Sequence, residues 1–129
     1  MKDFITPKGT VLPLLDLSGK PYLQVAHRLV WFREEHSDWS IETDYTETEK
    51  LVCFKATIKD QTGRILATAR KFTAVPAGQN KRESTESSSI GRCLALVGYG
   101  TQFCSEDLAE DPESISDSPA ERAKRQWKE

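Results

Sequence analysis

The chain has 129 residues, of which 37% are hydrophobic and 29% are charged, and this length and composition predict one globular domain. Its 18 Lys and Arg residues nearly balance 20 Asp and Glu residues, giving a formal net charge of −2, which excludes a uniformly basic nucleic-acid binder of the histone kind. No apolar run approaches the ~20 residues needed to cross a bilayer, and residues 1–10 lack the apolar stretch of a secretory signal.

Three widely spaced cysteines, Cys53, Cys93 and Cys104, form no CxxC motif. We therefore expect neither a disulfide framework nor a zinc site, and we expect a reducing, cytoplasmic environment. The charge is also spread unevenly. Residues 50–92 hold nine basic and three acidic residues, a net charge of +6, whereas residues 105–129 hold four basic and eight acidic residues, a net charge of −4. The basic stretch is either ordinary solvated surface or a local anion-binding face.

The N-terminal third of the chain predicts an arm followed by a helix. Residues 1–21 contain three prolines and two glycines, and we expect them to form an extended, irregular arm whose apolar residues pack on the core or on a neighbouring subunit. Residues 22–35 have helical periodicity after Pro21, with Leu23, Ala26 and Val30 on the predicted buried stripe.

Three strands are predicted next, over residues 39–45, 52–59 and 64–73, because apolar and polar residues alternate in each. Asp60-Gln61-Thr62-Gly63 has the composition of a hairpin turn. The pattern predicts an antiparallel meander with one solvated face, which carries Lys55 and Lys59. The third strand is apolar on both faces, so the sequence leaves open which face of the meander meets the second helix.

Residues 81–97 predict a second, longer helix whose apolar stripe includes Ile90, Cys93, Leu94 and Val97, and which ends at Gly98-Tyr99-Gly100. Gly91 lies inside it at a cost of ~1 kcal/mol relative to alanine. Either a close approach of backbone or DNA, or tight helix–sheet packing, explains this glycine.

Residues 105–129 are acidic and poor in hydrophobic residues, so we expect a disordered tail with a short helix over residues 120–128. The tail is either a solvated end or a segment that binds a partner or competes with DNA. The predicted fold is α+β. A three-stranded antiparallel meander is flanked by an N-terminal helix and crossed by a long C-terminal helix, in a core spanning residues 22–104. Its open sheet edges favour homo-oligomers.

Catalytic patterns are missing from the sequence. His27 and His36 are nine residues apart, and no HxH, HExxH, GxSxG or GxxxxGK[ST] motif occurs. We therefore expect no enzyme activity, catalytic residue, metal or cofactor.

Single-stranded nucleic acid fits the composition better, because it requires positive charge for its phosphates and flat side chains for its bases. Tyr45, Phe72 and Tyr99 are the nearby aromatic residues, although we expect Phe72 in the core. The candidate DNA-binding residues are Lys55, Lys59, Arg64, Arg70, Lys71, Lys81, Arg82 and Arg92.

A family resemblance sharpens this prediction. Residues 81–103, KRESTESSSIGRCLALVGYGTQF, resemble a helix of phage and bacterial single-strand annealing proteins with the pattern E-T-x-A-I-G-R-A-L-A-x-x-G-Y-G. Residues 22–43, YLQVAHRLVWFREEHSDWSIET, and 56–69, ATIKDQTGRILATA, resemble the same group. The group comprises the essential-recombination-function (ERF) proteins and their relatives in the Rad-fifty-two-like superfamily, and the resemblance covers about residues 20–104.

The resemblance implies a function and a geometry. Such proteins form rings or filaments that hold single-stranded DNA, backbone inward and bases outward, in a basic groove between hairpin and helix, and they pair complementary strands without ATP or metal. Arg92 falls on the helix arginine that faces this groove, and the other basic residues fall by region on or near the hairpin wall. The resemblance also implies a bacterial cell or a phage-infected host.

Two departures bear on these implications. Ser87-Ser88-Ser89 replace small apolar or threonine residues of the pattern, and the chain is short enough to lack parts of a ring interface or a second DNA site. Three functions therefore stay open: strand annealing, single-strand binding without annealing, and a small oligomeric adaptor domain that binds protein. The tail has a single-strand-binding or recombination protein as its candidate partner.

Overall fold

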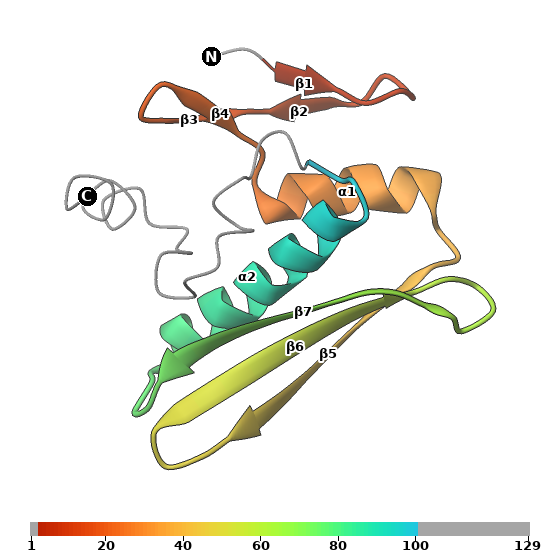
Figure 1. The fold of residues 1–129 in the computed structure, drawn as a ribbon. Helices are drawn as coiled ribbons and strands as arrows, with labels where there is room; N and C mark the ends of the chain where they lie inside the picture. Colours follow the sequence, from red (N-terminus) through yellow and green to blue (C-terminus); the bar gives the residue numbers. More distant parts are fainter. Residues whose placement is uncertain (1–2, 101–129) are drawn as a thin grey trace.

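Two helices and three antiparallel sheets make up residues 3–100, the part of the chain that this computed structural model describes (Figure 1). The predicted α+β class is confirmed. The predicted tail, its short helix and Cys104 lie outside the described residues. Neither helix among residues 3–100 combines the length and the apolar character that a membrane span requires.

The N-terminal region forms two β-hairpins, so the prediction of an irregular arm is wrong. β1 (Asp3–Ile5) pairs with β2 (Val11–Pro13), and β3 (Leu15–Leu17) pairs with β4 (Lys20–Tyr22). The glycines that indicated irregularity form the two turns, since Gly9 and Gly19 have φ angles of +93° and +85°. In the second turn, the Gly19 amide donates a hydrogen bond of 2.7 Å to Oδ1 of Asp16.

The predicted meander is present, as one sheet with strand order β5-β6-β7 (Figure 1). β5 spans Ser40–Glu47, β6 spans Leu51–Lys59 and β7 spans Ile65–Ala74. The predicted hairpin turn joins β6 to β7, and Gly63 has a φ angle of +88° there. Oδ1 of Asp60 accepts hydrogen bonds from the Thr62 hydroxyl and from the amides of Thr62 and Arg64. These bonds, led by the one from the Thr62 hydroxyl, lower the pKa of Asp60.

The inner face of this sheet packs against α2 (Gln79–Leu96). β6 contributes buried side chains at alternate positions, including Val52, Ala56 and Ile58, and the register pairs Ala56 with Ala69 of β7. On α2, the Cys93 thiol is fully buried and its Sγ lies 3.5 Å from the carbonyl oxygen of Ala56. The structure thus settles which face of the meander the second helix covers.

Small polar residues let α2 pack closely. Ser88 and Ser89 are buried, and the hydroxyl of Ser89 donates to the carbonyl of Glu86 at 2.6 Å. Thr85, also buried, donates to the carbonyl of Lys81 at 2.7 Å. Because these two hydroxyls bond within their own helix, burying them leaves no polar group unsatisfied, and the serine-rich segment becomes a close-packing surface.

The buried stripe predicted for the first helix is correct at Leu23, which is fully buried but precedes the helix, and wrong at its other two positions. α1 (Val25–Glu35) exposes Ala26 and Val30 and buries Arg28 and Phe32. The apolar periodicity did not predict this buried face, because the face contains a charged residue, Arg28, whose hydrogen-bond donors find acceptors inside the protein. The Nε and Nη1 atoms of Arg28 donate to the carbonyls of Leu23 and Gly91, each at 2.9 Å.

Arg28 also explains the glycine inside α2. A Cβ at Gly91 would lie 2.8 Å from Cγ2 of Val25 and 3.1 Å from Nη2 of Arg28. Of the two explanations that the sequence left open, close packing is therefore correct, although the neighbour is α1 rather than the sheet. A Cβ at Gly100, whose φ is +95°, would overlap Cδ of Arg28.

We predict that Gly91→Ala lowers the free energy of unfolding by up to about 2 kcal/mol, because overpacking of the contact between the helices costs about 1–3 kcal/mol and outweighs the ~1 kcal/mol that alanine gains over glycine in helix propensity. Urea denaturation followed by circular dichroism measures this change. Ser84→Ala, at an exposed position of the same helix, is the control and should stay within about 0.5 kcal/mol of the unaltered protein. Equal stabilities for Gly91→Ala and the control would contradict the packing seen here.

A second prediction concerns pH. Burial raises the pKa of the Cys93 thiol from 9.0 to about 11. The folded chain therefore keeps a proton that the unfolded chain releases, so the thiol's contribution to stability is complete below pH 9 and disappears as pH rises toward 11. Urea midpoints measured between pH 8 and 11 should fall less steeply for Cys93→Ala than for Cys53→Ala, and identical slopes would show that Cys93 does not contribute.

Candidate nucleic-acid interface

The structure divides the eight predicted DNA-binding residues among three places rather than one groove. Four of them lie on the outer face of the sheet, opposite α2, or at the tip of the β6–β7 hairpin. Two occur in the first turns of α2. The last two belong to the side of the sheet on which α2 packs. In that order, the three groups are Lys55, Lys59, Arg64 and Arg70; Lys81 and Arg82; and Lys71 and Arg92.

The outer-face group is the most compact. Lys55 of β6 pairs directly with Arg70 of β7. Both side chains project from the outer face, whereas those of Ala56 and Ala69 project from the inner face. Side chains in such directly opposite positions have Cβ atoms about 5 Å apart. Arg70 is exposed and Lys55 is half-buried. The middle of this face therefore carries two adjacent positive charges.

The positive charge continues toward the hairpin tip. Lys59 lies four residues beyond Lys55 on β6, and its Nζ forms an ion pair of 3.1 Å with Oε1 of Glu42. Arg64 is exposed directly after the turn. On the β5 side, Asp44 pairs with Lys55 and offsets part of the charge. The basic character of the outer face is therefore strongest along the β6–β7 hairpin.

Apolar groups border this charged row. Phe72 lies two residues beyond Arg70, on the same face, and is 38% exposed, so the expectation that it belongs to the core is wrong. Its directly opposite neighbour on β6 is Cys53. A shallow hollow of about 140 Å³ lies beside this row, and its lining residues are Asp44, Tyr45, Thr46, Cys53, Lys55 and Arg70.

Lys71 and Arg92 lie apart from this surface. Lys71 immediately follows Arg70, so the alternation of the strand turns it to the inner face, where it pairs with Phe54 and is buried. Grouping Lys71 with Lys55 and Arg70 was therefore wrong. Arg92 is half-buried on α2, the helix that covers the inner face. The hairpin basic residues and the helix arginine are consequently not opposite walls of one groove within a single chain.

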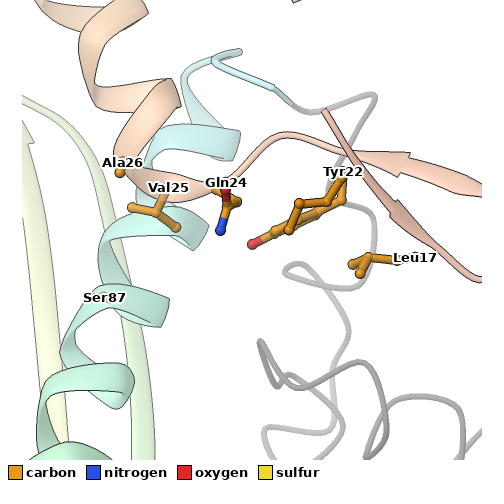
Figure 2. Close-up of a pocket in the computed structure, with 7 residues that line it drawn as sticks. Leu17, Tyr22, Gln24, Val25, Ala26 and Ser87 are labelled. Carbon is orange, nitrogen blue, oxygen red and sulfur yellow. The ribbon is translucent and has the colours of Figure 1, made fainter. Parts of the chain in front are cut away.

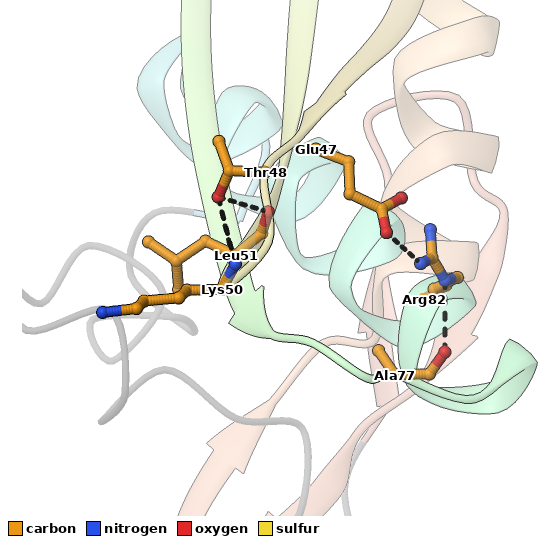
Figure 3. A network of polar contacts seen from close by, with 6 residues as sticks. All are labelled: Glu47, Thr48, Lys50, Leu51, Ala77 and Arg82. Carbon is orange, nitrogen blue, oxygen red and sulfur yellow. Dashed lines mark hydrogen bonds and ion pairs between the residues drawn. The ribbon is translucent and has the colours of Figure 1, made fainter.

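The basic residues at the start of α2 differ from each other. Nη2 of Arg82 forms an ion pair of 3.0 Å with Oε2 of Glu47, and its Nε donates to the carbonyl of Ala77 at 3.2 Å (Figure 3). The hydrogen bond from Arg82 lowers the pKa of Glu47. Arg82 thus ties the first turns of α2 to the end of β5, whereas Lys81 is exposed.

A second hollow, of about 220 Å³, lies between the β3–β4 hairpin, the start of α1 and α2 (Figure 2). Leu17 and Val25 contribute apolar surface to it, and Tyr22 is its one titratable lining residue. Within residues 3–100, no three His, Cys, Asp or Glu side chains cluster as a metal site would require. The ring of His36 stacks on that of Trp39, with 3.5 Å between the ring centroids.

Sequence reasoning missed two features of this surface. The first is the separation of Arg70 from Lys71, which the two-residue period of a strand predicts, since neighbours point to opposite faces. The second is the exposure of Phe72, for which the apolar character of β7 on both faces gave no signal.

The chain matches no protein-family model, no curated protein and no solved structure. Functional inference therefore depends on the geometry of the outer face together with the family resemblance of the sequence.

Proposed function

We propose that this protein binds single-stranded DNA and anneals complementary strands without ATP, as a homo-oligomer in homologous recombination or repair. The observation that carries the proposal is the adjacent placement of Lys55 and Arg70 on the outer face of the sheet, opposite α2, with Lys59 and Arg64 continuing toward the hairpin tip. The resemblance of residues 20–104 to single-strand annealing proteins supports the same function.

The chemistry required is modest. Phosphate contacts made by Lys and Arg supply affinity without sequence preference, because they neutralise charge that every strand carries. Such contacts leave the base edges available for pairing with a second strand. The proposal therefore needs no catalytic residue, metal or cofactor, and it places the protein in the cytoplasm of a bacterial cell or phage-infected host. Residues 105–129 are proposed to bind a single-strand-binding or recombination protein.

We predict that the double substitution Lys55→Glu with Arg70→Glu weakens binding to a labelled ~30-nucleotide single strand at least 10-fold. Fluorescence anisotropy at several salt concentrations measures this loss. Since each phosphate contact contributes about 0.7 to the slope of log K against log salt for a single strand, losing two contacts should reduce that slope by about 1.4.

The matched control is the double variant Lys8→Glu with Lys20→Glu, which changes the net charge equally but within the two N-terminal hairpins rather than on the outer face. Lys8 lies in the turn between β1 and β2, Lys20 belongs to β4, and both are exposed. Control and unaltered protein should bind alike. If both double variants lost the same single-strand affinity, the loss would be explained by net charge alone, which would contradict a defined outer-face site.

Adding the complementary strand at the end of the titration separates the three open functions. Accelerated pairing supports annealing, and binding without acceleration indicates a single-strand binder. A lack of binding at ~100 mM salt refutes both and favours the protein-binding adaptor. A loss confined to Arg92→Gln, with Lys55→Glu/Arg70→Glu unaffected, would place the strand on the α2 side, as the family resemblance implies.

A further inference from the structure

We infer that Phe72 is a base-stacking platform on the outer face, so that one unpaired base lies on its ring while the phosphates lie along Lys55 and Arg70. This inference rests on the proposed function and specifies how the strand is held. It starts from an exposed aromatic ring beside charged side chains: Phe72 is 38% exposed and lies on the same face as Arg70.

The geometry of the sheet brings the two kinds of group within the span of one nucleotide. Phe72 and Arg70 are two residues apart on one strand, which separates them by about 7 Å. Lys55 lies directly opposite Arg70, and Cys53 lies directly opposite Phe72. Cys53 is a small residue, and together with Lys55 and Arg70 it lines the shallow hollow on this face.

A nucleic-acid strand accounts for this surface better than a second protein copy does. Packing another sheet over Phe72 would also cover the neighbouring Lys55 and Arg70, and removing those charges from water is costly unless an opposite charge accompanies them. A polyanion supplies that charge, while its bases supply flat apolar surface for the ring. Both properties of the outer face are then used by one ligand.

Stacking on Phe72 would also make the protein bind single strands in preference to duplexes. Every base of a single strand has a free π-face, whereas the bases of a duplex are already stacked on their neighbours. The ring engages the face of a base and leaves its pairing edge free, so that stacking on Phe72 is compatible with annealing. Phe72 should thus contribute to single-strand affinity alone, whereas Lys55 and Arg70 should contribute to both.

The experiment compares Phe72→Ala, Phe72→Leu and Phe72→Tyr by anisotropy, on a single strand and on a duplex containing the same sequence. The alanine and leucine variants should lose between about 5- and 100-fold in single-strand affinity and less than about 2-fold in duplex affinity. The tyrosine variant, which keeps an aromatic ring, should retain single-strand affinity. Val11→Ala is the control, since Val11 of β2 is another exposed apolar residue, 57% exposed, and it lies outside the β5-β6-β7 sheet; this variant should bind like the unaltered protein.

Several outcomes would overturn the inference. If Phe72→Leu keeps single-strand affinity while Lys55→Glu/Arg70→Glu loses it, the strand is bound but not stacked, and only this inference fails. Equal losses on single strand and duplex would show a structural role for the ring. A changed molecular mass by light scattering with unchanged DNA affinity would make Phe72 a subunit contact. If the unaltered protein binds no DNA, the proposed function fails, and the inference with it.

Discussion

The buried guanidinium of Arg28 is the interaction on which the arrangement of the elements depends. It is inaccessible to solvent, and it donates to the carbonyls of Leu23 and Gly91 at 2.9 Å and to the hydroxyl of Tyr22 at 3.4 Å. A buried charge is tolerated only where hydrogen bonds satisfy it. One side chain therefore joins the segment before α1, the helix α1 itself and the middle of α2.

The helix that Arg28 joins to α1 also covers one face of the sheet and leaves the opposite face uncovered by either helix. Gly91 and the adjacent small residues of α2 allow that helix to touch α1 on one side and the sheet on the other. With α2 packed against the inner face, the alternation of β6 and β7 sends Lys55, Arg70 and Phe72 to the other face. The helix contacts thus position the candidate interface without contributing a residue to it.

The sequence predicted the elements whose patterns are long and regular. The strict alternation of Val52, Phe54, Ala56 and Ile58 predicted β6 and its buried face, and Gly63 marked the following turn. Strands of three residues are too short for periodicity to reveal, so the two N-terminal hairpins were missed. Periodicity did not place Arg28 in the core, because it ranks residues by polarity and takes no account of carbonyls that approach from distant segments. Phe72 is exposed because α2 packs against the other face of the sheet, and this tertiary contact cannot be deduced from the local pattern of β7.

The limited charge of the outer face constrains how tight binding could arise. Four basic residues, one of them paired with Glu42, neutralise few phosphates, so a single copy would bind weakly and with a shallow salt dependence of about 0.7 per contact. Copies bound side by side on one strand would add their contacts, because each bound copy raises the effective concentration of the next site. The open edges of β5 and β7 permit such alignment, with acidic Glu42 and Asp44 on the first strand and Arg70 on the second. Head-to-tail contact between these edges would place the outer faces of neighbouring copies on one continuous surface. Assembly is therefore part of the proposed function rather than an addition to it.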